Sequence, residues 1–328
     1  MSNKVPRSRI LIIGKANAGK TSILKKICGD ADIPIVHDRN GKRVIALESL
    51  DPTTGRGLHN VENEITYPGS PQFAFHDSRG IETASITEIN RLADFIARRG
   101  SSAMSWEQRL HATWICLPLD DERPLSEAEM RMIALNPEEV PVVVVFTKYD
   151  GLETRAFNKM HREGGVSLRE AYRAMKGVAE RLFKEQWLER IYDTEPPKPP
   201  FVRLKDLHKP EGSCEELTQC TENVLKDNQP AHKMFILAQK YKLEKRLKHA
   251  LPDAIKFLLS EIGHRGQDSL DDLVKRVLTW MPHVYQRTVS VGIIQACPDL
   301  IFSLLHDWIG YSNHRNIPNS TNVRIVDL

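Results

Sequence analysis

The chain has 328 residues, of which 41% are hydrophobic and 27% are charged. These proportions fit a globular protein of about two domains and exclude a collagen-like or an intrinsically disordered chain. The 46 Lys and Arg residues nearly balance the 43 Asp and Glu residues, for a formal charge of +3. Charge therefore gives no support for binding along a nucleic-acid backbone or to an acidic membrane.

Cysteine usage and apolar runs bear on the compartment in which the protein works. The cysteines are widely spaced and form no CxxC pair, which argues against a disulfide framework and predicts a reducing compartment. They are Cys28, Cys116, Cys214, Cys220 and Cys297. The first apolar run, 10–13, stops at Gly14 and Lys15, so no signal-peptide core is expected. No stretch approaches the roughly 18 apolar residues of a membrane span, and we expect a cytoplasmic protein.

Short apolar and β-branched runs predict the strands. In chain order these runs are 9–13, 43–47, 72–76, 112–117, 142–146 and 201–204. The run 142–146 is the clearest, because five consecutive apolar residues suit a central parallel strand that is covered on both faces. The proline-rich segment 196–200 can form neither a helix nor an inner strand, so we expect it to connect to the last strand.

Ser-x-x-Glu capping boxes predict where helices begin between these strands. The boxes are Ser85 with Glu88, Ser126 with Glu129, and Ser167 with Glu170. Strands that alternate with helices are typical of a doubly wound, mostly parallel α/β sheet. Beyond about residue 228 the strand-like runs stop and apolar residues follow helical spacing, as in 270–281. We therefore expect an α/β domain over 1–228 and a helical C-terminal extension over 229–328.

The segment 14–21 reads GKANAGKT and matches GxxxxGK[ST] between a predicted strand and a predicted helix, which is the context that a phosphate-binding loop requires. Its glycines let the backbone N–H groups wrap around phosphates. Lys20 would add a positive charge at the β- and γ-phosphates, and the Thr21 hydroxyl would ligate Mg²⁺. The expected phosphate-binding residues are Gly14, Lys15, Ala16, Asn17, Ala18, Gly19, Lys20, Thr21 and Ser22.

Two later motifs, each after a predicted strand, narrow the class of nucleotide. Asp77 and Gly80 form a DxxG motif, in which a carboxylate can hold Mg²⁺ through water and a glycine N–H can meet a γ-phosphate. Thr147, Lys148 and Asp150 form a TKxD motif. A carboxylate only accepts hydrogen bonds, so Asp150 suits guanine N1–H and N2–H₂ and rejects adenine, whose N1 is an acceptor. Lys148 can lay its methylene stem along the purine.

In this order the three motifs resemble those of the G domain of P-loop GTPases, in the class that includes Ras-like, Era-like and septin-like proteins. The resemblance covers about residues 8–225, and the chain is also similar to fungal proteins with a G domain followed by helices. It implies that the first motif binds phosphates, DxxG senses the γ-phosphate and TKxD reads guanine. Thr147 replaces the more usual Asn, as in Rho-like members.

The resemblance also implies a switch threonine that ligates Mg²⁺ and a fifth loop that contacts guanine. Thr53 or Thr54 could be that threonine, although a plain turn explains the segment equally well. The segment 203–206 is the only positional candidate for the fifth loop, with Lys205 as the expected contact. Its side chains do not match the family pattern, so this assignment rests on position.

Catalytic residues are harder to assign. Ras-like enzymes carry a water-orienting glutamine directly after DxxG, whereas this chain has Ile81, which cannot hydrogen-bond a water. We therefore expect slow hydrolysis, with roles for Lys20, Thr21 and Gly80. Arg56 or Arg79 could act as an arginine finger, but solvated loop charges explain them as well.

The sequence thus predicts a guanine-nucleotide-binding protein with GTP or GDP and Mg²⁺ as ligands. We expect a slow GTPase that acts as a molecular switch with an unidentified effector or regulatory protein. Two alternatives remain open at this point. One is a non-hydrolysing nucleotide-binding scaffold, and the other is a P-loop ATPase or small-molecule kinase.

Overall fold

The computed structural model describes residues 7–29, 33–44, 60–78, 86–120, 125–134, 140–192 and 198–239. The chain divides into two compact units, Met1–Tyr241 and Lys242–Leu328. All described residues lie in the first unit, and the domain boundary expected at residue 228 remains a prediction. The predicted helical stripe at 270–281 and the capping residue Ser85 lie outside the described residues.

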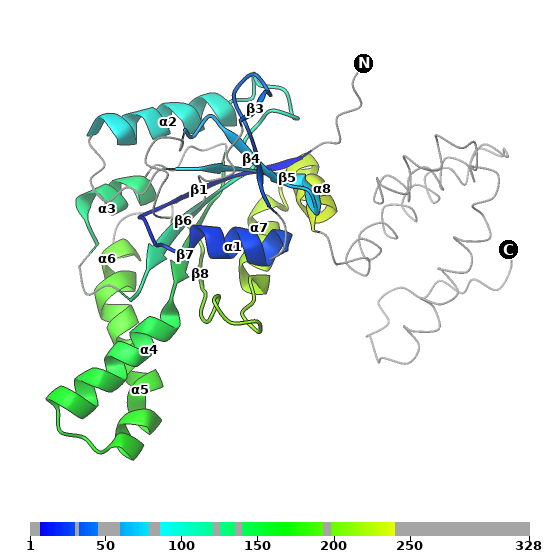
Figure 1. The fold of residues 1–328 in the computed structure, drawn as a ribbon. Helices are drawn as coiled ribbons and strands as arrows, with labels where there is room; N and C mark the ends of the chain where they lie inside the picture. The colour runs from blue at the N-terminus through cyan, green and yellow to red at the C-terminus, as the bar shows by residue number, and fades with distance from the viewer. Residues whose placement is uncertain are drawn as a thin grey trace, which may run out of the picture. The chain divides into compact units, whose positions relative to one another are not determined.

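An eight-stranded sheet forms the centre of the first unit, with the strand order β3-β2-β4-β5-β1-β6-β7-β8 (Figure 1). The strands are β1 (Ser8–Gly14), β2 (Ile35–His37), β3 (Arg43–Val44), β4 (Glu64–Tyr67), β5 (Ser70–Asp77), β6 (Ala112–Pro118), β7 (Val142–Thr147) and β8 (Phe201–Arg203). Strands β5, β1, β6, β7 and β8 are parallel neighbours. The other pairs, from β3 to β5, are antiparallel. The predicted mostly parallel α/β fold is confirmed.

Helices cover both faces of this sheet (Figure 1). They are α1 (Lys20–Cys28), α2 (Ile86–Gly100), α3 (Glu127–Ala134), α4 (Tyr149–Asn158), α5 (Leu168–Phe183), α6 (Glu189–Tyr192), α7 (Glu215–Leu225) and α8 (Gln229–Ala238), with π-helical turns at Lys159–Glu163 and Lys184–Leu188. Helices α1, α7 and α8 pack on one face, and α2 to α6 pack on the other. Among the described helices, none has the length and hydropathy needed to cross a bilayer.

Successive side chains of a strand point to opposite faces of the sheet, so each strand contributes to the core on both faces. In β1, Ile10 and Ile12 pack toward α1, whereas Leu11 and Ile13 pack toward α2. Trp114 of β6 is fully buried on the α1 face, and its indole N–H donates a 3.0 Å hydrogen bond to the Thr221 hydroxyl of α7. A buried indole N–H requires such a partner, so this bond fixes α7 on the sheet.

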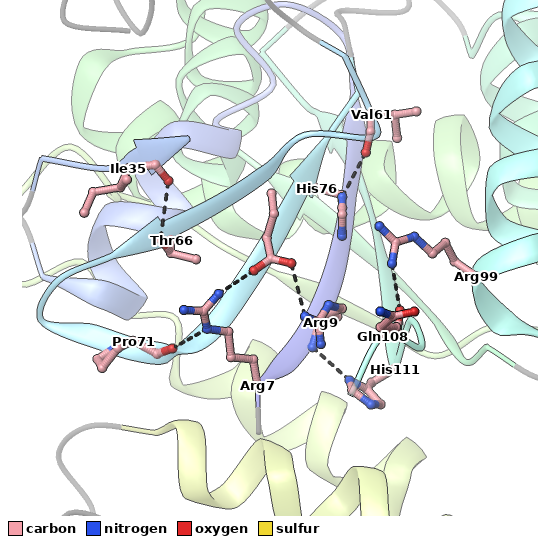
Figure 2. Close-up of polar contacts among 11 residues, drawn as sticks. Arg7, Arg9, Ile35, Val61, Thr66, Pro71, His76, Arg99, Gln108 and His111 are labelled. Atoms are coloured by element: carbon pink, nitrogen blue, oxygen red, sulfur yellow. Dashed lines mark hydrogen bonds and ion pairs between the residues drawn. The ribbon is translucent and has the colours of Figure 1, made fainter. Parts of the chain in front are cut away.

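A polar cluster lies on the α2 face of the sheet (Figure 2). Arg7, just before β1, and Arg9 of β1 donate to the two carboxylate oxygens of Glu64 on β4, at 2.6 and 3.1 Å. The Arg9 side chain is 11% exposed and the Glu64 side chain is 16% exposed. Burial alone would raise the pKa of Glu64, but the two arginines hold it below its ordinary value. The cluster therefore ties β1 to β4 across the intervening strand β5.

Two buried histidines beside this cluster are held neutral mainly by their burial. His76 Nδ1 lies 2.9 Å from the Val61 carbonyl oxygen, and because a carbonyl only accepts, this nitrogen carries the proton. His111 Nδ1 accepts a 2.8 Å hydrogen bond from the backbone N–H of Arg9. Burial, together with Arg99, lowers the pKa of His76 to about 4. Burial, together with Arg9, lowers the pKa of His111 to about 4.

We expect the free energy of unfolding to fall as the pH drops from 6.5 toward 4. In that range His76 and His111 bind protons only when the chain unfolds, so acid favours the unfolded state. At pH 5 each histidine should cost about 2 kcal/mol of stability relative to pH 7. Urea unfolding at both pH values measures the loss. His111→Asn keeps an acceptor for the Arg9 N–H and should remove roughly half of the pH dependence; an unchanged pH dependence in this variant would contradict the assignment.

Candidate nucleotide site

The GxxxxGK[ST] segment connects β1 to α1 in a tight loop that contains two residues with left-handed backbone angles. Asn17 has a φ of 60° and Gly19, which precedes α1, has a φ of 79°. Asn is among the side chains that tolerate this region, and Gly has no steric penalty there. A Cβ on Gly14 would lie 2.7 Å from the Cys116 carbonyl oxygen. Glycine at position 14 therefore allows the loop to pass close to β6.

Lys20 lies against the backbone of its own loop. Its Nζ donates to the carbonyl oxygens of Gly14 at 2.9 Å and Lys15 at 3.1 Å. The same nitrogen is 3.8 Å from Asp77 Oδ1 at the end of β5, and both side chains are nearly buried. Thr21 follows in the first turn of α1, where the backbone N–H groups of a helix have no intrahelical partners and suit an anion. The structure thus brings the first motif to the aspartate of the second.

Thr147, the last residue of β7, joins the third motif to the first. Its hydroxyl donates a 2.9 Å hydrogen bond to the Ala18 carbonyl oxygen, and its side chain is fully buried. The Thr147 side chain also lies 3.6 Å from the position that a Cβ on Gly19 would take. This hydrogen bond therefore holds the loop that follows β7 against the GxxxxGK[ST] loop.

Lys148 adopts a left-handed conformation, with a φ of 56°. Its Nζ lies 2.7 Å from Asp120 Oδ2, just beyond the end of β6, and both side chains are more than a third exposed. A Cβ on Gly151 would come within 2.7 Å of the Asp120 Cβ, so glycine lets the two loops meet. No sequence motif marked Asp120. Its position just beyond a predicted parallel strand, at the edge where ligands bind, was the available signal.

Asp150 faces the loop that follows β8. Its Oδ1 accepts a 3.0 Å hydrogen bond from the backbone N–H of Asp206. Asp206 has a φ of 54°, and its carboxylate pairs with Lys209 at 2.8 Å, which lowers the pKa of Asp206. Lys205 instead points to Glu153, with 3.9 Å between Nζ and Oε1. The structure therefore places the backbone at 205–206 beside Asp150.

Two backbone hydrogen bonds hold that loop next to the TKxD motif. The Leu204 N–H donates to the Phe146 carbonyl at 2.7 Å, and the Tyr149 N–H donates to the Leu204 carbonyl at 3.1 Å. The chain then turns back where a Cβ on Gly212 would meet the Asp206 carbonyl oxygen at 2.3 Å. Only glycine fits this turn without a shift of the backbone.

Several predicted residues lie outside the described part of the chain. Gly80 of DxxG, the switch candidates Thr53 and Thr54, Ile81, and the arginines Arg56 and Arg79 belong to this group. Their expected roles remain predictions.

Comparisons with known proteins agree with this geometry. Residues 9–148 match the family model described as 50S ribosome-binding GTPase. The tRNA modification GTPase MnmE of Bordetella petrii is 25% identical over 219 residues, which cover 67% of this chain and 42% of that protein. The MnmE of Dechloromonas aromatica is 23% identical over 226 residues, or 69% of this chain and 44% of that protein. The chain thus spans less than half the length of these relatives.

Among solved structures, the G domain of the T. maritima FeoB iron transporter matches 67% of this chain and 99% of its own, with 12% identity and a TM-score of 0.32. The motif order, the sheet and the family match over residues 9–148 together indicate a P-loop G domain of the GTPase class in this part of the chain. Its similarity to fungal proteins remains a prediction.

Proposed function

We propose that the protein binds GTP and GDP with Mg²⁺, hydrolyses GTP slowly in the cytoplasm and acts as a molecular switch for an unidentified regulatory protein. The observation that supports this most directly is the linkage of motif loops at the carboxyl edge of the sheet. Thr147 bonds to Ala18, and Lys20 lies 3.8 Å from Asp77. The groups proposed to bind phosphates and the groups proposed to read the base therefore lie on one edge, where open α/β sheets bind ligands.

The proposed division of labour follows from the side chains. Lys20 would leave the loop carbonyls to neutralise charge at the β- and γ-phosphates, where charge develops during transfer. The Thr21 hydroxyl and the Asp77 carboxylate are hard oxygen donors, which fit Mg²⁺. Bound Mg²⁺ would supply charge neutralisation at the phosphate oxygens. Asp150 would accept from guanine N1–H and N2–H₂, beside backbone N–H groups of the loop at 205–206.

The slow rate and the switch rest on residues outside the described part of the chain. Ile81 offers no hydrogen bond to a water, so this position cannot orient the nucleophile as a glutamine does. Loss of the γ-phosphate would release Gly80 and the loop around Thr53 or Thr54, and this change of order would be the signal.

Titration of the full chain with fluorescent GTP, GDP and ATP in Mg²⁺ tests the proposal. We expect ATP to bind at least about 100-fold more weakly than GTP, because adenine leaves the Asp150 carboxylate without a donor. Equal binding of ATP would favour the ATPase or kinase alternative. Phosphate release in single turnover then separates a GTPase from a non-hydrolysing scaffold, which would bind GTP and release no phosphate.

Replacing Lys20 with methionine should lower GTP affinity by about 100-fold, because the phosphates lose a charge-assisted partner. Competition against a fluorescent guanine nucleotide measures the change. Lys25→Met provides a matched control, since Lys25 is an exposed lysine on the same helix. Equal affinities of the two variants would show that Lys20 does not contact the phosphates.

A further inference from the structure

Lys15, in the phosphate-binding loop, forms an ion pair that the function proposed above does not use. Its Nζ lies 3.1 Å from Glu129 Oε1 on α3. The Lys15 side chain is 16% exposed and the Glu129 side chain is 4% exposed. A carboxylate this deeply buried requires a partner. The loop that is proposed to bind phosphates therefore contains a second lysine whose charge is already matched.

Glu129 is fixed by the first turn of its own helix. Its Oε2 accepts 2.8 Å hydrogen bonds from both the backbone N–H and the hydroxyl of Ser126. The Glu129 N–H in turn donates to the Ser126 hydroxyl at 3.3 Å, which completes the predicted capping box. Met132 and Ile133 anchor the helix in the core. The remaining oxygen, Oε1, is thus held toward Lys15 by a rigid element.

The backbone of Lys15 organises the rest of the loop. Its carbonyl oxygen accepts from the Ala18 N–H at 3.2 Å and from Lys20 Nζ at 3.1 Å. Rotation of the Lys15 peptide would therefore displace the ammonium group proposed to meet the phosphates. The side chain of the same residue is held by Glu129, so one contact with α3 limits this rotation.

We propose that Glu129 is a positioning residue of the nucleotide site. It acts through Lys15, whose peptide it holds in the orientation that places Lys20 and the Ala18 N–H. The inference rests on the proposed function, because it concerns affinity at the same site. It adds that α3, which contains none of the nucleotide motifs, controls the shape of the phosphate-binding loop.

Charge alone would give a different pattern of effects. If the pair acted only through its electric field, removal of the Glu129 charge would tighten phosphate binding and removal of the Lys15 charge would weaken it. If the pair positions the loop, both changes weaken binding. The two effects would also not add, because either change breaks the same contact.

The experiment measures the dissociation constants of fluorescent GDP and GTP for the full-length wild type, Glu129→Gln, Lys15→Met and the double variant. We expect each single variant to bind both nucleotides about 10-fold more weakly than wild type. The double variant should bind no more weakly than the single variant with the larger dissociation constant. Gln can still complete a capping box. Lys15→Arg, which can still pair with Glu129, should remain within about twofold of wild type.

Glu127→Gln is the matched control, because it makes the same change in the same helical turn at a residue whose side chain is 79% exposed. Its affinity should match wild type. Tighter binding by Glu129→Gln, or additive losses, would overturn the inference. If Glu129→Gln fails to fold, Glu129→Asp decides, because it keeps the charge but shortens the reach to Lys15: weaker binding supports positioning, and unchanged binding overturns it. Absence of guanine preference in the wild type would instead refute the proposed function.

Discussion

Replacing Asp150 with asparagine is expected to lower GTP affinity by at least about 100-fold and to raise affinity for xanthosine triphosphate. The asparagine amide would place a donor against the guanine amino group, and the base would lose one of its acceptors. Xanthine carries a carbonyl at that position, so the amide donor would be satisfied there. Competition with both nucleotides against a fluorescent analogue measures the exchange of preference.

The structure makes asparagine the informative substitution at this position. Asp150 Oδ1 accepts from the backbone N–H of Asp206 at 3.0 Å, and an asparagine oxygen can accept the same bond. The loop after β8 should thus keep its place while the base specificity changes. Asp94→Asn, an exposed change on α2, is the control. Loss of binding without any gain for xanthosine triphosphate would mean that Asp150 supports the loop and does not read the base.

Replacing Glu64 with glutamine is expected to lower the free energy of unfolding by about 3 kcal/mol at pH 7. Arg9 and Arg7 would then lack their carboxylate, and the Arg9 side chain is only 11% exposed. Removing one partner of a buried ion pair leaves the other charge uncompensated, which costs more than the pair itself contributes. Urea unfolding measures the loss.

An exposed ion pair provides the comparison. Glu127 and Arg131 of α3 pair at positions i and i+4, with side chains that are 79% and 46% exposed. Glu127→Gln should therefore change the free energy of unfolding by less than about 0.5 kcal/mol. Similar losses in Glu64→Gln and Glu127→Gln would show that burial of the β1 to β4 cluster does not determine its contribution.

The sequence predicted those features whose physical cause is local. The runs at 9–13 and 142–146 are buried on both faces and became β1 and β7. The capping boxes at Ser126 and Ser167 involve residues within one turn, and both form hydrogen bonds in the structure. The three motifs end up on one edge because each follows a parallel strand.

Features that depend on distant contacts escaped the sequence analysis. Strands β2 and β4 are short, and Glu64–Tyr67 alternates polar and apolar residues, so no continuous apolar run marks it. The pairs that Lys15 and Lys148 form join separate segments without any motif spacing. The loop at 205–206 meets Asp150 through a backbone N–H. Every residue except proline has this group, so side-chain identity could not reveal it.

The hydrogen bond between Thr147 and Ala18 has a consequence for how tightly parts of a nucleotide can bind. It joins the two loops rigidly, so a nucleotide would act as a bivalent ligand whose second half binds at a high effective concentration. Guanosine and pyrophosphate, offered separately, would each have to bind without that advantage. The site would then hold an intact nucleotide in the presence of much higher concentrations of free nucleoside or inorganic phosphate.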